Sequence, residues 1–383
     1  MLLSPSRPSG VAASAPSLSD SIASLSSPAA MVTTSVTNTY SRSPMKPPRF
    51  AGSISARVFI ALAALFSHSA LSRAADAPKP PAETELRAAI TKSLGYLAKG
   101  SDQWMADKNC NSCHHLPQVL WNHREAKRRG FSVDPKQFDA WLTWSEGNAK
   151  NISAGREMTA FMKLALPEKP APELTQIIVK GQLPDGSWKP GGQFIAQRRE
   201  AHEVTANSAR IFLLALGTQA ADQEITAQAR TKAATLLGKN EPEKSEKSVE
   251  TLAYRTLYAQ RFGKPEEVAA LRAELLKLQH ADGGWGWLIS ESQSDAIATG
   301  LTLFALQPSA EPTVAGAITH AQRWLLGKQA DDGGWPVDFT RISKGDRSAP
   351  AKAKSLKDAT MIYSYWGTAW STLGLLQAVP VQP

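Results

Sequence analysis

Gln279-His-Ala-Asp-Gly-Gly-Trp285 is the stretch that decides the fold, because the chain repeats it. The same pattern, Q-x-x-D-G-[GS]-W, returns at residues 182–188 and 329–335. Each copy ends one amphipathic stretch with helical spacing and precedes another apolar stretch of the same kind. Repetition at intervals such as the 50 residues between Trp285 and Trp335 is typical of folds built from stacked helical units. The sequence therefore predicts an all-α protein.

Helices are expected over residues 173–180, 266–278 and 314–328 before the three copies, and near 204–216, 296–306 and 361–376 after them. Two decayed copies extend the pattern. Leu236-Leu-Gly-Lys-Asn240 matches Leu325-Leu-Gly-Lys-Gln329, and residues 96–104, which end in Trp104, match the same segment more weakly. About five helical hairpins result.

The residue types of the repeated loop have a structural explanation. Asp-Gly forms a tight turn, because glycine tolerates positive φ and the aspartate accepts a backbone N–H. The glutamine amide is expected to tie a helix end to the N-terminus of the next helix, where free N–H groups remain. The tryptophan ring is expected to cover that joint. Trp188, Trp285 and Trp335 are therefore predicted to be structural and not to contact substrate.

These repeats resemble the QW repeats of the squalene–hopene cyclase and prenyltransferase superfamily, over residues 83–377. The resemblance implies an α/α toroid, with inner and outer helices alternating around a centre. It does not bring the family's reactions. The Asp-x-Asp-Asp acid of the cyclases is missing, since residues 294–299 offer only Asp295. Asp331 and Asp332 belong to a repeat turn, and the zinc ligands of protein prenyltransferases and the Cys-Gly-Glu-Gln thioester are absent.

Cys110-Asn-Ser-Cys-His114 holds both cysteines of the chain in the C-x-x-C-H spacing of c-type haem attachment. Cys110 and Cys113 would form the two thioethers, and His114 would be the proximal iron ligand. A dithiol, a disulfide or another metal site are the alternatives. The motif lies at a junction between repeats, and the chain resembles exported proteins that join such a segment to cyclase-like repeats.

Export is required for this attachment and is predicted from the N-terminus. Residues 58–66 are an apolar run, preceded by basic residues and followed by the small-x-small pattern Ser72-Arg-Ala74. The run is too short to span a bilayer as a helix. We expect residues 1–44 to be a disordered or wrongly assigned extension and 45–75 to be a signal peptide, which leaves no transmembrane anchor. Residues 76–170 would hold the first repeat and the haem segment, and 171–383 the remainder of one continuous ring.

The sequence offers several candidates for the distal iron ligand. Met158 and Met162 are the candidates, because they lie four residues apart on one face of a helix expected at 154–166. Met158 is the first choice, because it follows the stretch 147–155, which is expected to give the chain slack to fold back over the haem. Core filling is the alternative for both. His123, His202 and an open site remain as further alternatives. Three tryptophans near the motif fit either the walls of a haem pocket or ordinary core packing: Trp121, Trp141 and Trp144.

The formal charge of +9 falls to +4 without residues 1–75, so the basic balance belongs partly to the targeting segment. Arg124, Lys127, Arg128 and Arg129 cluster after the haem motif. A solvated helix face is expected there, with docking of an acidic partner or of haem propionates as the alternative. No nucleic-acid-binding module is present.

Two functions follow, and whether the chain is an enzyme is left open. The first is a periplasmic or otherwise exported haem protein that transfers electrons to a redox partner, with the toroid as scaffold. The second is a haem-dependent oxidoreductase with an apolar or polymeric ligand in the toroid cavity. A purely structural haem is a third option. Low-spin, six-coordinate iron favours electron transfer, whereas an open site favours catalysis.

Overall fold

A computed structural model describes residues 79–107, 115–149, 157–167, 172–190, 200–217, 223–240, 246–307, 309, 311–337 and 348–382. These residues belong to one compact unit. The predicted N-terminal extension and signal peptide lie outside them.

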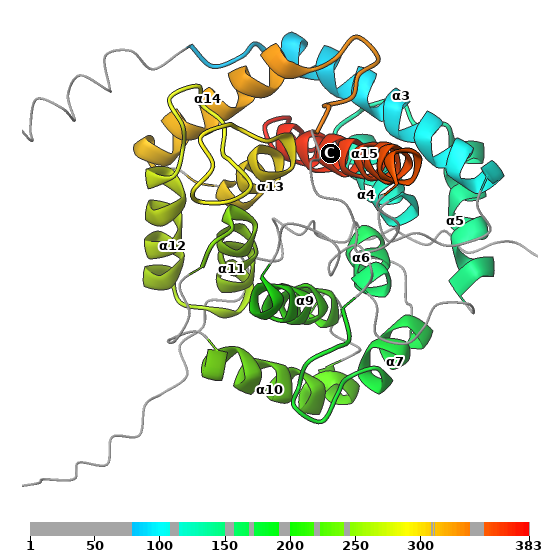
Figure 1. The fold of residues 1–383 in the computed structure, drawn as a ribbon, viewed down its shortest axis with the longest axis vertical. Coiled ribbons are helices and arrows are strands. Elements are labelled where there is room, and N and C mark those ends of the chain that lie inside the picture. Colours follow the sequence, from blue (N-terminus) through cyan, green and yellow to red (C-terminus); the bar gives the residue numbers. More distant parts are fainter. Residues whose placement is uncertain are drawn as a thin grey trace, which may run out of the picture. The chain divides into compact units, whose positions relative to one another are not determined.

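The described residues form twelve α-helices, which alternate between an outer and an inner position around a ring (Figure 1). The all-α toroid is confirmed, and the expected number of about five hairpins is one short of the six pairs seen. The outer helices are α3 (Glu83–Asp107), α5 (Pro135–Ala149), α7 (Pro172–Lys180), α10 (Gln223–Asn240), α12 (Pro265–Lys277) and α14 (Pro312–Lys328). The inner helices are α4 (Leu116–Arg128), α6 (Glu157–Ala165), α9 (Ala201–Leu216), α11 (Val249–Phe262), α13 (Ala296–Leu306) and α15 (Ala349–Leu376).

Local sequence explains where several helices begin. Pro265 occupies the first turn of α12, where its missing N–H costs nothing, and two glutamates follow it near the positive end of the helix dipole. Ser248 caps α11 by accepting the N–H of Thr251 at 3.2 Å. The expected helix at 361–376 begins earlier, at Ala349, and so gives the longest helix of the described chain.

The inner helices run parallel to one another. Near their N-termini, the Glu203 carboxylate of α9 accepts the N–H groups of Lys247 and Ser248, just before α11. Near their C-termini, Gln260 of α11 donates to the Ala305 carbonyl of α13. Every connection from an outer to an inner helix therefore lies at one end of the ring, the N-terminal end of the inner helices. The segment with the C-x-x-C-H motif, between α3 and α4, is one of these connections.

The three repeat loops share one hydrogen-bond pattern. Each glutamine Nε2 donates to the carbonyl of the glycine four residues later, at 2.8–3.0 Å, and to a carbonyl within the next outer helix, at 2.8–2.9 Å. The expected tie to free N–H groups of a helix N-terminus is therefore wrong, because the amide N–H groups donate to carbonyls. The acceptors in the next outer helices are Ala229, Ala317 and Ala89, for Gln182, Gln279 and Gln329. Since Ala89 belongs to α3, the last loop joins the final outer helix to the first.

The repeat glycines and tryptophans complete each joint. The glycines have φ near +90°, and a Cβ there would lie 2.4–2.7 Å from a carbonyl oxygen of the next outer helix. Each tryptophan is at most 1% exposed, and its Nε1–H donates to a carbonyl ten residues earlier in its own outer helix at 2.7–2.8 Å. The structural interpretation is confirmed for all three tryptophans: Trp188, Trp285 and Trp335.

Buried aromatic side chains from different inner helices meet in the centre of the toroid. The Trp370 ring of α15 lies 5.8–6.4 Å, between centroids, from one ring on each of α4, α6, α11 and α13. We call these residues, with Trp366, the aromatic lumen cluster: Trp121, Phe161, Tyr254, Phe304, Trp366 and Trp370. All are at most 8% exposed. Side chains therefore fill the ring at this level.

Close packing of α13 against α15 brings Trp370 into this position. A Cβ on Gly300 would lie 2.4 Å from the backbone nitrogen of Ser371, and one on Gly374 would lie 2.8 Å from the Gly300 carbonyl oxygen. The Ser371 hydroxyl donates to the Ala296 carbonyl at 3.1 Å. Only glycine allows two helices to approach so closely at these positions.

Candidate functional site

The C-x-x-C-H motif itself, with Cys110, Cys113 and His114, lies outside the described residues. Its flanks are described on both sides, since α3 ends at Asp107 and description resumes at His115, the N-cap residue of α4. The described part of the candidate site consists of the residues that follow the motif and of the helices beside them.

His115 is held tightly on the side of α3 and α15. Its ring is 3% exposed and stacks between Trp104, at 4.5 Å and 20°, and Tyr365, at 4.0 Å and 29°. The Tyr365 hydroxyl lies 2.7 Å from the Ser101 hydroxyl and donates to the Leu97 carbonyl at 3.0 Å. Burial raises the pKa of Tyr365, so it stays protonated. The residue after His114 is thus fixed by two aromatic rings.

Trp104 lies within α3 and stacks on His115, whereas the tryptophans of the three intact repeats follow their outer helices. The weak repeat at residues 96–104 therefore predicted an outer helix correctly. The contact could not be recognised from sequence, because Tyr365 completes the stack from 250 residues away.

Gln118, one turn into α4, is a buried amide without a partner. It is 0% exposed, and neither its Oε1 nor its Nε2 has a hydrogen-bond partner among the described residues. The Oδ1 of Asn122, one turn further on, is also without a partner, although its Nδ2 donates to the Gln118 backbone carbonyl at 2.9 Å. Buried amides are normally hydrogen bonded. These orphaned atoms, next to the motif, fit a polar group that the motif would bring.

The two methionines proposed as distal ligands are buried in α6, with Met158 3% and Met162 4% exposed. Arg124 of α4 donates to the Ala165 carbonyl of α6 at 2.7 Å, which aligns the two parallel helices. With a rise of about 1.5 Å per residue, Gln118 lies about 9 Å before Arg124 along the α4 axis, and Met158 lies about 10 Å before Ala165 along the α6 axis. The two residues therefore lie at a similar height along the two parallel helices. Met162 lies about 6 Å deeper along the ring. The alignment therefore places Met158 nearer than Met162 to the N-terminus of α4.

His123 is directed toward the outer layer. Its Nδ1–H donates to the Val119 carbonyl at 2.9 Å, and its ring packs edge-on against Trp141 of α5, with 4.8 Å between centroids. Burial lowers its pKa to about 4, so the imidazole is neutral at pH 7. Trp141 in turn donates to Asp102 of α3 at 2.7 Å. These contacts oppose His123 as a distal ligand and assign Trp141 to packing between α3, α4 and α5.

The remaining candidates have separate positions. His202 is partly buried at the second residue of α9, and its Nε2 has no hydrogen-bond partner among the described residues. Trp121 belongs to the aromatic lumen cluster. Trp144 is partly exposed on α5.

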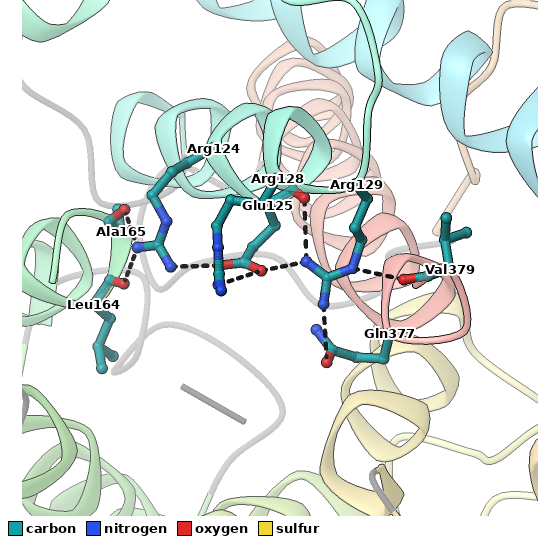
Figure 2. A network of polar contacts seen from close by, with 8 residues as sticks. All are labelled: Arg124, Glu125, Arg128, Arg129, Leu164, Ala165, Gln377 and Val379. Atoms are coloured by element: carbon teal, nitrogen blue, oxygen red, sulfur yellow. Dashed lines mark hydrogen bonds and ion pairs between the residues drawn. The ribbon is translucent and has the colours of Figure 1, made fainter. Parts of the chain in front are cut away.

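The basic cluster on α4 is not a solvated face (Figure 2). Arg124 and Arg129 are 8% and 3% exposed, and both contact the buried carboxylate of Glu125, which Arg128 approaches at 3.6 Å. Only Lys127 is exposed. The expectation is therefore wrong, because the sequence does not show that Glu125 binds the arginines inside the fold. We call the four residues the arginine–glutamate network: Arg124, Glu125, Arg128 and Arg129.

The network holds the C-terminal ends of two other inner helices. Arg124 donates to the Leu164 and Ala165 carbonyls at the end of α6, and Arg129 donates to the Val379 carbonyl just after α15 (Figure 2). A cation is favoured at the Leu164 and Ala165 carbonyls, which belong to the negative end of the α6 helix dipole. The network is therefore structural and links α4 to α6 and α15.

Asp295 and Asp332, the aspartates that were compared above with the catalytic acid of the cyclases, also have structural roles. Asp295 is the N-cap of α13, and its Oδ1 accepts the N–H groups of Ile297 and Ala298. Asp332 accepts the Gly334 N–H within its repeat turn. Within the described part of the chain, no three His, Cys, Asp or Glu residues gather as a metal-binding group. None of the described helices is long and apolar enough to cross a membrane.

No protein-family model and no curated protein matches the chain. Solved structures match by shape. A possible member of the GH105 family from Salmonella enterica superposes with a TM-score of 0.54 at 14% identity, over 79% of this chain and 96% of its own. The unsaturated glucuronyl hydrolase of a Bacillus species reaches 0.50 at 14% identity, over 76% and 96%. The type II terpene cyclase MstE from Scytonema reaches 0.47 at 14% identity, over 79% and 100%. The chain shares the α/α-toroid fold of the first two proteins, and a shared fold does not by itself imply a shared reaction.

Proposed function

We propose that the chain is an exported c-type haem protein that transfers electrons, and that the toroid is its scaffold. The observation that carries the proposal is the C-x-x-C-H motif in the connection between α3 and α4, next to buried polar atoms that lack partners. Cys110 and Cys113 would attach the haem and His114 would bind its iron. The bound group would supply one-electron chemistry.

The chain's own residues would hold and shield this group. His115, stacked between two rings, fixes the start of α4 and thereby the residue that precedes it. Met158 lies buried at the level of the first turn of α4. A thioether ligand there would favour a six-coordinate, low-spin iron with a raised potential.

The packing inside the ring supports a scaffold more than a substrate chamber. Rings from five of the inner helices meet at the aromatic lumen cluster, so a large apolar or polymeric ligand finds that level already filled. A haem-dependent oxidoreductase with its substrate deep in the toroid is therefore the weaker proposal.

Covalent haem is the first expected result. When the full chain is expressed with export and haem-attachment machinery, mass spectrometry after acid–acetone extraction should find one haem on a peptide that contains Cys110 and Cys113. A C110A/C113A variant, made in the same host, should lose it. An unmodified wild-type peptide from a host that correctly matures a control cytochrome would exclude the proposed function.

The iron of this protein should be low-spin, and Met158→Ala should convert it to a high-spin or water-bound form with a lower potential. Absorption spectroscopy and redox titration measure both changes. Met162→Ala is the matched control, because Met162 is equally buried but one turn deeper, and should mainly weaken packing, by about 2–5 kcal/mol. If the Met158→Ala variant kept the spectrum and potential of the wild type, Met158 would be excluded as the ligand. His202 would then be substituted and measured in the same way.

A further inference from the structure

Helix α15 begins well before the inner helices beside it. His115, directly before α4, stacks on Tyr365, and the carbonyl of Ala296, the first residue of α13, accepts the Ser371 hydroxyl at 3.1 Å. Because the inner helices are parallel, residues 349–361 of α15 extend beyond the N-terminal ends of both neighbours. At 1.5 Å per residue, the first of them lies about 24 Å before Tyr365. We call residues 349–361 the α15 arm.

The α15 arm has one packed side and one exposed side. Ala359 is buried, and Tyr363 continues this side into the core. On the other side, Lys354, Lys357 and Met361 follow the i, i+3, i+7 spacing of a single helix face, and all three are exposed. Met361, at 47%, is the most exposed of the large apolar side chains in the described chain. We call these three residues the arm face.

The α15 arm is basic. It carries three lysines, Lys352, Lys354 and Lys357, against one aspartate, so its net charge is +2. The aspartate is Asp358, which forms an ion pair with Lys354 at 2.5 Å, and both side chains are more than half exposed. The α4 arginines, which the sequence offered for docking an acidic partner, are instead buried around a glutamate. Exposed positive charge is therefore kept on the α15 arm and not on α4.

The arm face leads toward the flank of the haem motif. Met361 precedes Tyr365 by four residues, one helical turn or about 6 Å, and lies on the same side of α15. Tyr365 in turn stacks on His115, the residue that follows the motif, with 4.0 Å between ring centroids. A protein bound to the arm face would thus lie next to the start of α4.

We propose that the arm face docks the redox partner of this protein, and that this partner presents a surface rich in carboxylates. The inference rests on the proposed function, because it requires a haem that exchanges electrons. Opposite charges on two proteins raise the rate of their encounter. Methionine is enriched in the centres of protein interfaces, and electron-transfer complexes bury little area, so a short helical face is sufficient.

An acidic protein fits the arm face better than an anionic membrane does. A helix that lies in a membrane surface presents a broad apolar side to the lipids. The exposed side of the arm instead offers one large apolar residue, Met361, among lysines. Its apolar residues Ala359 and Tyr363 are already packed inside the protein.

The test uses the full haem-loaded protein and reduced plant-type ferredoxin, a small acidic one-electron donor, as the probe. One electron passes from the iron–sulfur cluster to the ferric haem, and stopped-flow absorption measures the second-order rate. Lys354→Glu/Lys357→Glu should lower this rate at least about tenfold at low ionic strength. The difference should largely vanish in about 1 M salt, where the Debye length is about 3 Å. Met361→Ala should lower the rate at both ionic strengths, because it removes a contact but no charge.

The matched control is Lys136→Glu/Lys232→Glu. It changes the net charge by the same amount at exposed positions of the outer helices α5 and α10, and should change the rate far less. The haem spectrum and midpoint potential should be the same in all variants, so that a slower rate reports the encounter and not the iron.

The inference would be wrong if Lys354→Glu/Lys357→Glu reacted as fast as the wild type, or if the control variant lost as much. It would also be wrong if the arm variant lost binding to vesicles of anionic lipid while its rate with ferredoxin stayed unchanged, because the occupant would then be a membrane. A wild-type protein without covalent haem would overturn the proposed function and the inference with it, and this is checked first.

Discussion

Replacing Glu125 with glutamine is expected to destabilise the protein by about 3–5 kcal/mol, because the change leaves buried arginines without their counter-charge. Arg124 and Arg129 contact this carboxylate directly, at side-chain exposures of 10% and 3%, and the carboxylate itself is 5% exposed. Burial alone would raise the pKa of Glu125, but Arg124, Arg129 and Arg128 outweigh it, and the pKa is lowered overall. Denaturation by guanidinium chloride measures the loss.

The pH dependence of stability provides a further check on this prediction. A carboxylate whose pKa is lower in the folded state stabilises the fold above its unfolded pKa, and this contribution is lost as the pH falls through the folded value. The wild type should therefore lose stability in acid more steeply than Glu125→Gln, which has no carboxylate to protonate at this position.

The matched control is Glu83→Gln. Glu83 forms an ion pair with Arg87 at 2.7 Å, four residues away, but its side chain is 54% exposed. An exposed pair of this kind is worth less than about 1 kcal/mol. If Glu125→Gln cost no more than this control, the arginine–glutamate network would not hold α4 to α6 and α15.

Trp335→Ala and Trp285→Ala should each destabilise the fold by about 3–5 kcal/mol, as expected for the loss of a large buried aromatic side chain. Both rings are at most 1% exposed and donate a hydrogen bond to their own outer helix. Trp335 follows the loop in which Gln329 binds the Ala89 carbonyl, so its loss also loosens the closure of the ring. Thermal and chemical unfolding of the purified variants measure the effect.

Trp324→Ala is the control for the tryptophan variants. Trp324 lies in α14, is only partly buried, and donates to Asp282 at 2.9 Å at the surface. Its loss should cost clearly less than that of Trp335. A Trp285 or Trp335 variant that unfolds like the wild type but fails to bind a ligand would contradict the structural interpretation.

The repeat loops show how far sequence alone could reach. Their turn is local: Asp, Gly and Trp lie within four residues, and glycine with positive φ follows from that chemistry. The partner of each glutamine was not predictable, because it is a carbonyl of another outer helix, 38–240 residues away. The hydrophobic periodicity predicted the helices themselves. The sixth helix pair was missed, because a degenerate repeat can keep its helical structure after its sequence motif is no longer recognisable.

The candidate site divides in the same way. The C-x-x-C-H motif is a covalent pattern of five neighbours, so sequence predicts its chemistry without a structure. The environment of Gln118 follows only from folding, because a glutamine near a helix start is common, and burial decides whether its amide needs a partner. The four-residue spacing placed Met158 and Met162 on one helix face, and the alignment of α4 with α6 supplies a reason from the structure to rank Met158 first.

The sequence by itself determined the all-α repeat, its tight turns and the haem-attachment motif, because each depends on residues close together in the chain. Only the tertiary structure decided that the α4 arginines are buried around Glu125 and that aromatic rings fill the inside of the toroid. Charge and hydrophobicity along one helix do not reveal which residues of the other helices its buried side chains meet. That choice follows from how six helix pairs close into a ring, and therefore from contacts between residues far apart in the sequence.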